Sequence, residues 1–137
     1  MKNILIDTDI LIDFLRGKKK VKEFLLSVAE ENTLYCSVIT VAEIYAGMCE
    51  EEKEQTDDLL GSLNIVEINR AIAEKAGRYR HQIRRQQLEL DDCMIAASAF
   101  YVKALLVTGN GKHYPMSDIE KTVIPTDRPR YSGEVNG

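Results

Sequence analysis

Three acidic residues stand at positions where carboxylates could do chemistry. Asp7 ends an apolar run, Glu43 lies in the middle of an apolar helical stretch, and Asp92 lies at the start of another. Charged side chains in such surroundings are costly to bury unless they are paired or bind a cation. If the fold brings the three together, they form an all-oxygen site of the kind that hard cations such as Mg²⁺ or Mn²⁺ prefer.

Glu43 is the least easily explained of the three as a surface residue. Thr40 lies three residues before it, on the same helical face, and is small enough to leave room for an ion or a substrate. The alternative is a solvent-facing Glu on an amphipathic helix. The sequence leaves both interpretations open.

Asp91 and Asp92 together open the helical segment that contains the third carboxylate. If Asp91 is the N-cap, Leu90 falls at N′ and Ile95 at N4, which is the hydrophobic-staple arrangement. That assignment leaves Asp92 free for chemistry. The alternative is that both carboxylates serve only the helix dipole.

Asp7 and Asn110 each follow a predicted strand. In an open α/β sheet, ligands bind outside the carboxyl ends of the strands, so we expect both residues at that edge. Asp7 could instead serve only as the cap of the helix that follows it, although Thr8 is available for that role.

The elements that must position these residues alternate between strand and helix. Apolar runs predict strands at residues 3–6, 34–36, 63–68 and 104–107, with an edge strand at 123–124. Helical spacing predicts helices at about 10–15, 21–30, 38–45, 50–60, 71–86 and 92–102, with Ser37 capping the third. Because strands that alternate with helices imply parallel crossovers, we expect a helix-flanked α/β sheet.

The chain has 137 residues, of which 45% are hydrophobic. That length and composition predict one compact domain with its own core. We expect residues 1–127 to form this domain and residues 128–137 to be a flexible C-terminal tail.

Cysteine usage indicates a reducing compartment. The chain has an odd number of cysteines, three, and no pair of them has C-x-x-C spacing. They are Cys36, Cys49 and Cys93, and they predict neither a disulfide framework nor a zinc site. We therefore expect a cytoplasmic protein.

The apolar N-terminal stretch is interrupted by Asp7, Asp9 and Asp13. These charges exclude a signal-peptide core or a membrane span there, so no contact with a membrane is expected. We expect Asp9 and Asp13 to be exposed or to start a helix.

The net charge of −4 excludes a protein that coats nucleic acid by bulk electrostatics. Any contact with nucleic acid must be local or assisted by a metal ion. Two basic runs are candidates for such a contact, although a solvated helix face would explain them as well. They are Lys18, Lys19 and Lys20, and Arg78, Arg80, Arg84 and Arg85.

Four motifs, in order along nearly the whole chain, resemble those of the PIN-domain nucleases, most closely the VapC-type toxins of toxin–antitoxin pairs. The opening ILIDTDILID is similar to the family's strand-ending Asp motif, TVAEIYAG to its Glu-bearing helix, and LDDCMIAA to its D-x-x-I-A-A element. LLVTGNGKHY resembles the T-x-N-x-x-D-F element after the fourth strand. Four motifs in order are far more specific than any one of them.

The resemblance implies a PIN-like three-layer α/β/α sandwich with a mostly parallel sheet of four to five strands. It implies that Asp7, Glu43 and Asp92 bind Mg²⁺ or Mn²⁺ and that Asn110 joins them as a catalytic residue. Residues implied to orient water and phosphate are Thr8, Thr40 and Thr108.

The implied activity is endoribonuclease action by the toxin of a type II toxin–antitoxin module. The substrate would be RNA, such as a tRNA or rRNA loop, cut by metal-activated water without a side-chain nucleophile. A VapB-like antitoxin would inhibit the toxin by laying a C-terminal segment in the groove and bringing a basic side chain to the carboxylates. The resemblance also implies a homodimer and a toxin–antitoxin hetero-oligomer.

The last motif departs from the family pattern at three positions. Gly109 stands where Arg is frequent, and His113 with Tyr114 stands where Asp with Phe is common. The departure removes a fourth acidic ligand, so a weaker second metal site would follow. His113 is expected to be a surface loop residue.

Two other functions remain open at the level of sequence. The opening DTD also fits haloacid-dehalogenase-like phosphatases, with Asp7 as a covalent nucleophile and Asp9 as acid and base, but this leaves Glu43 without a role. A PIN-like domain that binds RNA or a partner without cutting is the second alternative.

Overall fold

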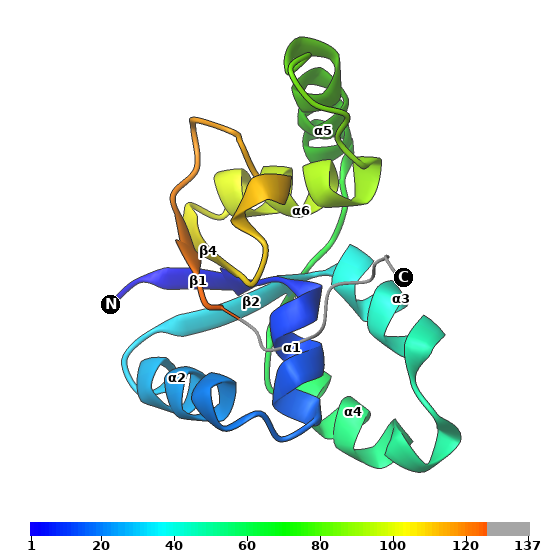
Figure 1. The fold of residues 1–137 in the computed structure, drawn as a ribbon, viewed down its shortest axis with the longest axis vertical. Coiled ribbons are helices and arrows are strands. Elements are labelled where there is room, and N and C mark those ends of the chain that lie inside the picture. The colour runs from blue at the N-terminus through cyan, green and yellow to red at the C-terminus, as the bar shows by residue number, and fades with distance from the viewer. Residues whose placement is uncertain (126–137) are drawn as a thin grey trace.

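A parallel sheet of five strands lies at the centre of residues 1–125, the part of the chain that this computed structural model describes (Figure 1). The strands are β1 (Asn3–Ile6), β2 (Thr33–Ser37), β3 (Asn64–Val66), β4 (Ala104–Thr108) and β5 (Lys121–Val123). Their order in space is β3-β2-β1-β4-β5, and all four pairings are parallel. The predicted tail, residues 128–137, lies outside the described residues.

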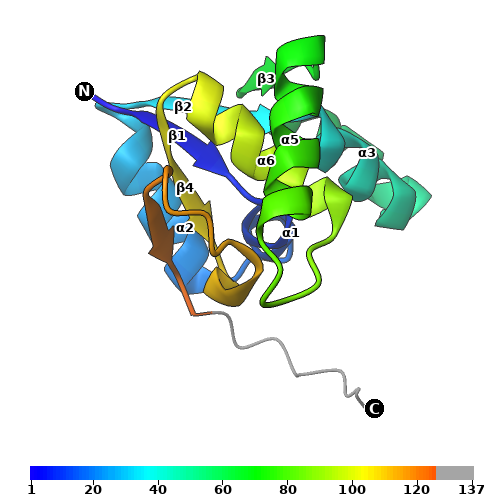
Figure 2. The same ribbon diagram turned by 90° about the horizontal axis from the view of Figure 1, so that it is seen from above.

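Helices cover both faces of this sheet. They are α1 (Thr8–Leu15), α2 (Lys19–Ala29), α3 (Val38–Gly47), α4 (Lys53–Gly61), α5 (Arg70–Gln82) and α6 (Leu90–Tyr101), with short 3₁₀ turns η1 (Glu50–Glu52) and η2 (Gly111–His113). Figures 1 and 2 show α5 and α6 on one face, while α1, α2 and α4 lie on the other. The expected three-layer α/β/α sandwich is confirmed.

Alternating residues of the central strands supply a core to each layer. Leu5 and Leu106 pack under α5 and α6, while Ile4, Ile6 and Val107 pack under α1 and α2. Successive strand residues point to opposite faces, and both faces of this sheet are buried. The strands therefore read as continuous apolar runs rather than as an alternating pattern.

Two predicted elements are longer than the observed ones. The strand expected at 63–68 pairs only over β3, and the helix expected at 71–86 ends at Gln82. At Ile83 the backbone turns to φ −90° and ψ 106°, which is extended. Ile83 is the last apolar position of that face, and the polar residues 84–87 have nothing to bury, so no packing extends the helix.

None of the helices within residues 1–125 is both long enough and apolar enough to cross a lipid bilayer.

Leu5→Ala is expected to lower the free energy of unfolding by about 2–5 kcal/mol, because it leaves a cavity beneath α6. Leu5 is fully buried, at 0% exposure. Urea denaturation measures the change, with Leu26→Ala as the control, since Leu26 is 63% exposed. A loss no larger than that of the control would show that the β1 core contributes little.

Candidate active site

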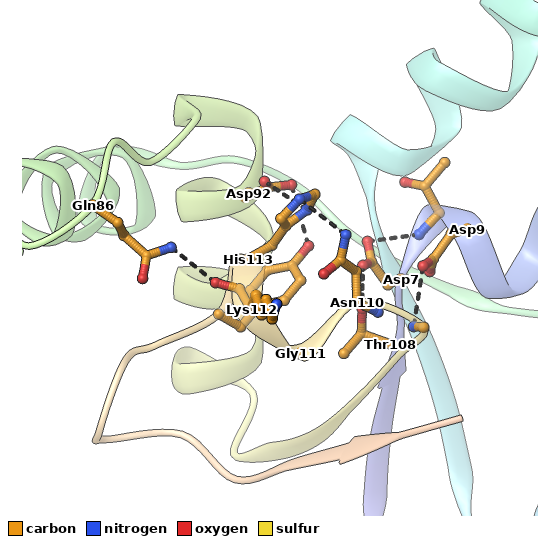
Figure 3. Close-up of polar contacts among 12 residues, drawn as sticks. Asp7, Asp9, Gln86, Asp92, Thr108, Asn110, Gly111, Lys112 and His113 are labelled. Carbon is orange, nitrogen blue, oxygen red and sulfur yellow. Dashed lines mark hydrogen bonds and ion pairs between the residues drawn. The ribbon is translucent and has the colours of Figure 1, made fainter. Parts of the chain in front are cut away.

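The carboxyl ends of the parallel strands place several polar residues at one edge of the sheet. Register pairs Ile6 of β1 with Val107 of β4, so Asp7 and Thr108 come to lie side by side. The backbone amide of Asp7 donates to the carbonyl of Val107 at 2.9 Å, which extends the pairing by one residue. Figure 3 shows Asp7, Thr108 and Asn110 gathered at this edge.

Asp7 is buried and hydrogen-bonded through both carboxylate oxygens. Oδ1 accepts from the backbone amide of Thr8 at 2.8 Å, and Oδ2 accepts from the Thr108 hydroxyl at 2.7 Å. The Thr108 hydroxyl in turn accepts from the backbone amide of Asn110 at 3.1 Å. Asp7 therefore caps α1, the structural role considered from the sequence, while it is also held by β4.

Thr8 does not cap α1 but connects that helix to Glu43 on α3. Its hydroxyl lies 2.5 Å from Glu43 Oε1 and 2.9 Å from the Thr40 hydroxyl. Because a hydroxyl has one proton, Thr8 can donate to the Glu43 carboxylate while it accepts from Thr40. Thr40 is fully buried, so its hydroxyl reaches the site only through Thr8.

Burial raises the pKa of the Glu43 carboxyl, and the nearby charges of Asp91, Asp7 and Asp92 raise it further. The hydrogen bond from Thr8 opposes this shift because it favours the ionised form. Glu43 therefore shares an electrostatic environment with three carboxylates on two other segments, including the two with which it was predicted to act. It does not face solvent as an ordinary surface Glu.

Asp92 lies in the first turn of α6, but the predicted cap was wrong. The helix begins at Leu90 with Glu89 as the N-cap, so Asp91 is the second helical residue and is exposed. The Cys93 amide donates to the Glu89 carbonyl at 3.0 Å, which starts the helix two residues earlier than Asp91 would as a cap. The staple pattern was misleading because Leu90 is 41% exposed.

The last residue of η2, His113, and the residue that follows it, Tyr114, contact the Asp92 carboxylate. His113 Nδ1 lies 3.4 Å from Oδ2, and the Tyr114 hydroxyl donates to Oδ1 at 3.4 Å. His113 Nε2 also lies 3.0 Å from the Asn110 amide nitrogen, so the ring joins Asn110 to Asp92 (Figure 3). With Nε2 accepting from that amide, the proton is assigned to Nδ1, facing the carboxylate.

Burial raises the pKa of Asp92, and the charges of Asp7 and Asp91 act in the same direction. His113 and the Tyr114 hydroxyl lower it by stabilising the ionised form. The sequence placed His113 on a surface loop, and it is exposed, but its contact with Asp92 was missed. Tyr114 is fully buried between Asp92 and Asp7 and was also missed. Their position inside the fourth family-like motif was the available signal.

Asp9 and Asp13 have different surroundings, although both were expected to be exposed or to start a helix. Asp9 lies in the first turn of α1, where its Oδ2 accepts from the Gly109 amide at 3.1 Å. Asp13 is 1% exposed, so its predicted exposure was wrong. It follows Ile10 by three residues and therefore shares that residue's inward helix face.

The donor set at this edge has the chemistry of a hard-cation site. Asp7, Glu43 and Asp92 offer only oxygen atoms, and mutual repulsion contributes to the raised pKa values of the last two. A divalent cation would relieve that repulsion. In their present rotamers, however, no three His, Cys, Asp or Glu side chains of residues 1–125 form a ligating cluster. Each carboxylate is instead engaged by donors of the protein.

Residues 4–118 match the PIN domain model. This range contains the six helices, β2 to β4, all but the first residue of β1 and every residue of this edge, but not β5. The chain therefore belongs to the PIN domain family. The match removes the phosphatase alternative, which also left Glu43 without a role.

Within that family, the chain groups with VapC-type members. It is 34% identical to Ribonuclease VapC10 of Mycobacterium tuberculosis over 131 residues, covering 93% of this chain and 98% of the relative. A toxin–antitoxin complex from Klebsiella pneumoniae matches at 30% identity and TM-score 0.72, covering 85% of this chain and 94% of that one. VapBC2 from Rickettsia felis, bound to a promoter DNA fragment, matches at 21% identity and TM-score 0.79, covering 89% and 98%. The resemblance inferred from the four motifs is confirmed.

Glu43→Gln is expected to stabilise the metal-free protein at neutral pH and to lose this advantage in acid. The pKa of Glu43 is raised in the folded state, so wild-type stability falls as pH rises from the unfolded to the folded pKa. Gln cannot ionise and avoids that loss.

Urea unfolding between about pH 4 and about pH 8 with a chelator measures the stability difference between this variant and wild type. The control is Glu23→Gln, which removes the same charge from an exposed position on α2. A stability difference that does not widen with pH would contradict the electrostatic account of Glu43.

Proposed function

We propose that this chain is an endoribonuclease that acts as the toxin of a type II toxin–antitoxin module. The observation that carries the proposal is the electrostatic coupling of Glu43, Asp7 and Asp92, which reach one sheet edge from three separate segments. Such an arrangement destabilises a protein unless a cation or a cationic group uses it. The ribonuclease names of the curated relatives support the same activity.

Asp7, Glu43 and Asp92 would hold Mg²⁺ or Mn²⁺. A divalent cation there supplies positive charge that favours ionisation of an attacking water and neutralises the phosphate oxygens. Thr108 keeps Asp7 in place through its hydroxyl, and Thr8 does the same for Glu43.

The hydroxyl and amide groups differ in what they can touch. Thr40 and Thr108 are fully buried, so Thr108 orients Asp7 directly and Thr40 orients Glu43 only through Thr8. Thr8 is partly exposed and Asn110 is exposed, which leaves their side chains open to water or a phosphate oxygen. His113 keeps the Asn110 amide beside Asp92.

A VapB-like antitoxin is the proposed partner, in a hetero-oligomer that also contains a toxin homodimer. Several similar solved structures are toxin–antitoxin complexes, which supports this partner. A basic side chain inserted among the carboxylates would relieve the repulsion that raises the pKa values of Glu43 and Asp92. The proposed setting is the cytoplasm, with tRNA or rRNA loops as substrates.

Asp7→Asn, Glu43→Gln and Asp92→Asn are each expected to reduce RNA cleavage by at least about 100-fold, because each removes a charged ligand. Growth arrest on expression should disappear in parallel, at equal protein level. Asp58→Asn on α4 is the control, since it removes an exposed carboxylate away from the sheet edge. Arrest that survives all three site changes would separate toxicity from this chemistry, and a folded protein that cuts no RNA would be a binding domain.

Metal removal is expected to abolish cleavage, and Mg²⁺ or Mn²⁺ is expected to restore it. Binding alone should stabilise the folded state by about 2.7 kcal/mol at a metal concentration 100 times Kd. Thermal unfolding with and without metal measures this stabilisation without reference to activity. Asp7→Asn should lose it, whereas cleavage that continues in excess chelator would contradict a metal-dependent mechanism.

A further inference from the structure

Positive charge on this acidic chain gathers in two separate places, at the start of α2 (Lys18, Lys19, Lys20 and Lys22) and along α5 and the loop that follows it. Residues 75–88 contain five basic and no acidic residues, whereas residues 50–58 contain six acidic residues and one lysine. In the fold, the first stretch forms most of α5 and the loop to α6, and the second forms η1 and the start of α4. Figure 1 shows α5 and α4 on opposite faces of the sheet.

Four arginines form the exposed part of the basic stretch, and we call them the arginine patch. They are Arg78, Arg80, Arg84 and Arg85. Arg84 Nε donates to the His81 carbonyl at 2.7 Å, and Arg85 Nη2 donates to the Pro115 carbonyl at 3.4 Å. No ion pair among residues 1–125 involves any of the four, so no carboxylate there neutralises their charges.

The arginine patch is continuous with the candidate active site. Gln86 Nε2 donates to the Lys112 carbonyl at 2.8 Å, and Lys112 directly precedes His113, which contacts Asp92 (Figure 3). The charge of Arg80 also reaches Cys93, next to Asp92, where it opposes the burial that raises the thiol pKa to about 11. The loop that carries Arg84 and Arg85 therefore adjoins the segment whose His113 contacts Asp92.

Charge also decides which ligand the patch fits. The carboxylate edge repels a polyanion, and with a net charge of −4 the chain as a whole offers no compensating attraction. A nucleic acid that reaches Asp92 therefore needs local cations beside the edge, and Arg suits phosphate because its planar donors bind two oxygens at once. The acidic stretch formed by η1 and the start of α4 cannot supply these local cations.

We propose that the arginine patch binds the sugar–phosphate backbone of the RNA substrate on one side of the phosphate that is cut. This inference rests on the proposed function and adds the direction in which the RNA leaves the site. The RNA runs from the carboxylate edge past Lys112 to the start of the α5–α6 loop. The α4 side stays free of nucleic acid.

Binding of fluorescein-labelled tRNA, measured by anisotropy on the Asp7→Asn protein, tests the proposal. Raising KCl from about 50 to about 200 mM weakens tRNA binding by the Asp7→Asn parent. The fold-loss of affinity over this range should be about sevenfold smaller for R84Q/R85Q, because two phosphate contacts are gone. R84K/R85K keeps the charges and should keep the parental salt dependence. K20Q/K22Q is the matched control, with two exposed charges removed from α2 on the other face.

Cleavage assays on proteins that keep Asp7 separate RNA binding by the arginine patch from the proposed nuclease function. R84Q/R85Q should raise KM and leave kcat at saturation unchanged, since the arginines do not touch the reacting phosphate. If wild type cuts RNA but R84Q/R85Q matches K20Q/K22Q in KM and salt dependence, the arginine patch does not bind RNA. If R84Q/R85Q behaves in this way and loses only its affinity for the antitoxin, the arginine patch is a protein interface. If wild type cuts no RNA with Mg²⁺ or Mn²⁺, the proposed function itself fails.

Discussion

The hydrogen bond from Thr108 to Asp7 joins the ends of the two central strands and fixes the geometry of the whole edge. It depends on the β1–β4 register, which sets Ile6 beside Val107 and thereby aligns the first residue beyond β1 with the last residue of β4. A slip of one residue would turn the side chains of β1 to the opposite faces and exchange its two cores. The register is secured by burial, because Leu5 packs on one side of the sheet and Ile4 and Ile6 on the other.

Around that bond, neutral donors hold carboxylates that repel one another. Thr8 donates to Glu43, Tyr114 donates to Asp92, and the backbone amide of Thr8 donates to Asp7. Each donor favours the ionised form, while burial and neighbouring charges favour the protonated form. For Glu43 and Asp92, burial is the largest influence and the pKa is raised. The fold thus maintains a local electrostatic strain at the site where a cation is expected to bind.

The sequence predicted the alternating elements and the carboxylates because both leave local patterns. Apolar runs identified the strands, and the burial cost of Glu43 identified it as unusual. The start of α6 was harder, because Asp is a better N-cap than Glu by residue type. The hydrogen bond from the Cys93 amide to the Glu89 carbonyl nevertheless begins the helix at Leu90. The inward face of Asp13 also required the packing of α1, which no pattern of charged residues reveals.

Contacts between distant loops could not be predicted from the sequence, for a different reason. His113 reaches Asp92 only because η2 follows β4 along the sheet edge while α6 begins beside it. That approach depends on loop paths and on the rotamer of one exposed ring, and neither has a periodic signature. The family-like motif supplied the neighbourhood, but not the contact.

The all-parallel topology has a consequence for synthesis of the chain. Asp7 and Thr108 lie 101 residues apart, and β1 cannot gain its β4 neighbour until residue 108 has left the ribosome. At about 5–20 residues per second, the nascent polypeptide spends several seconds with β1 made and β4 absent. An activity that needs both strand ends is therefore withheld until β4 has also been made, which gives the cell a delay between synthesis of β1 and completion of the site.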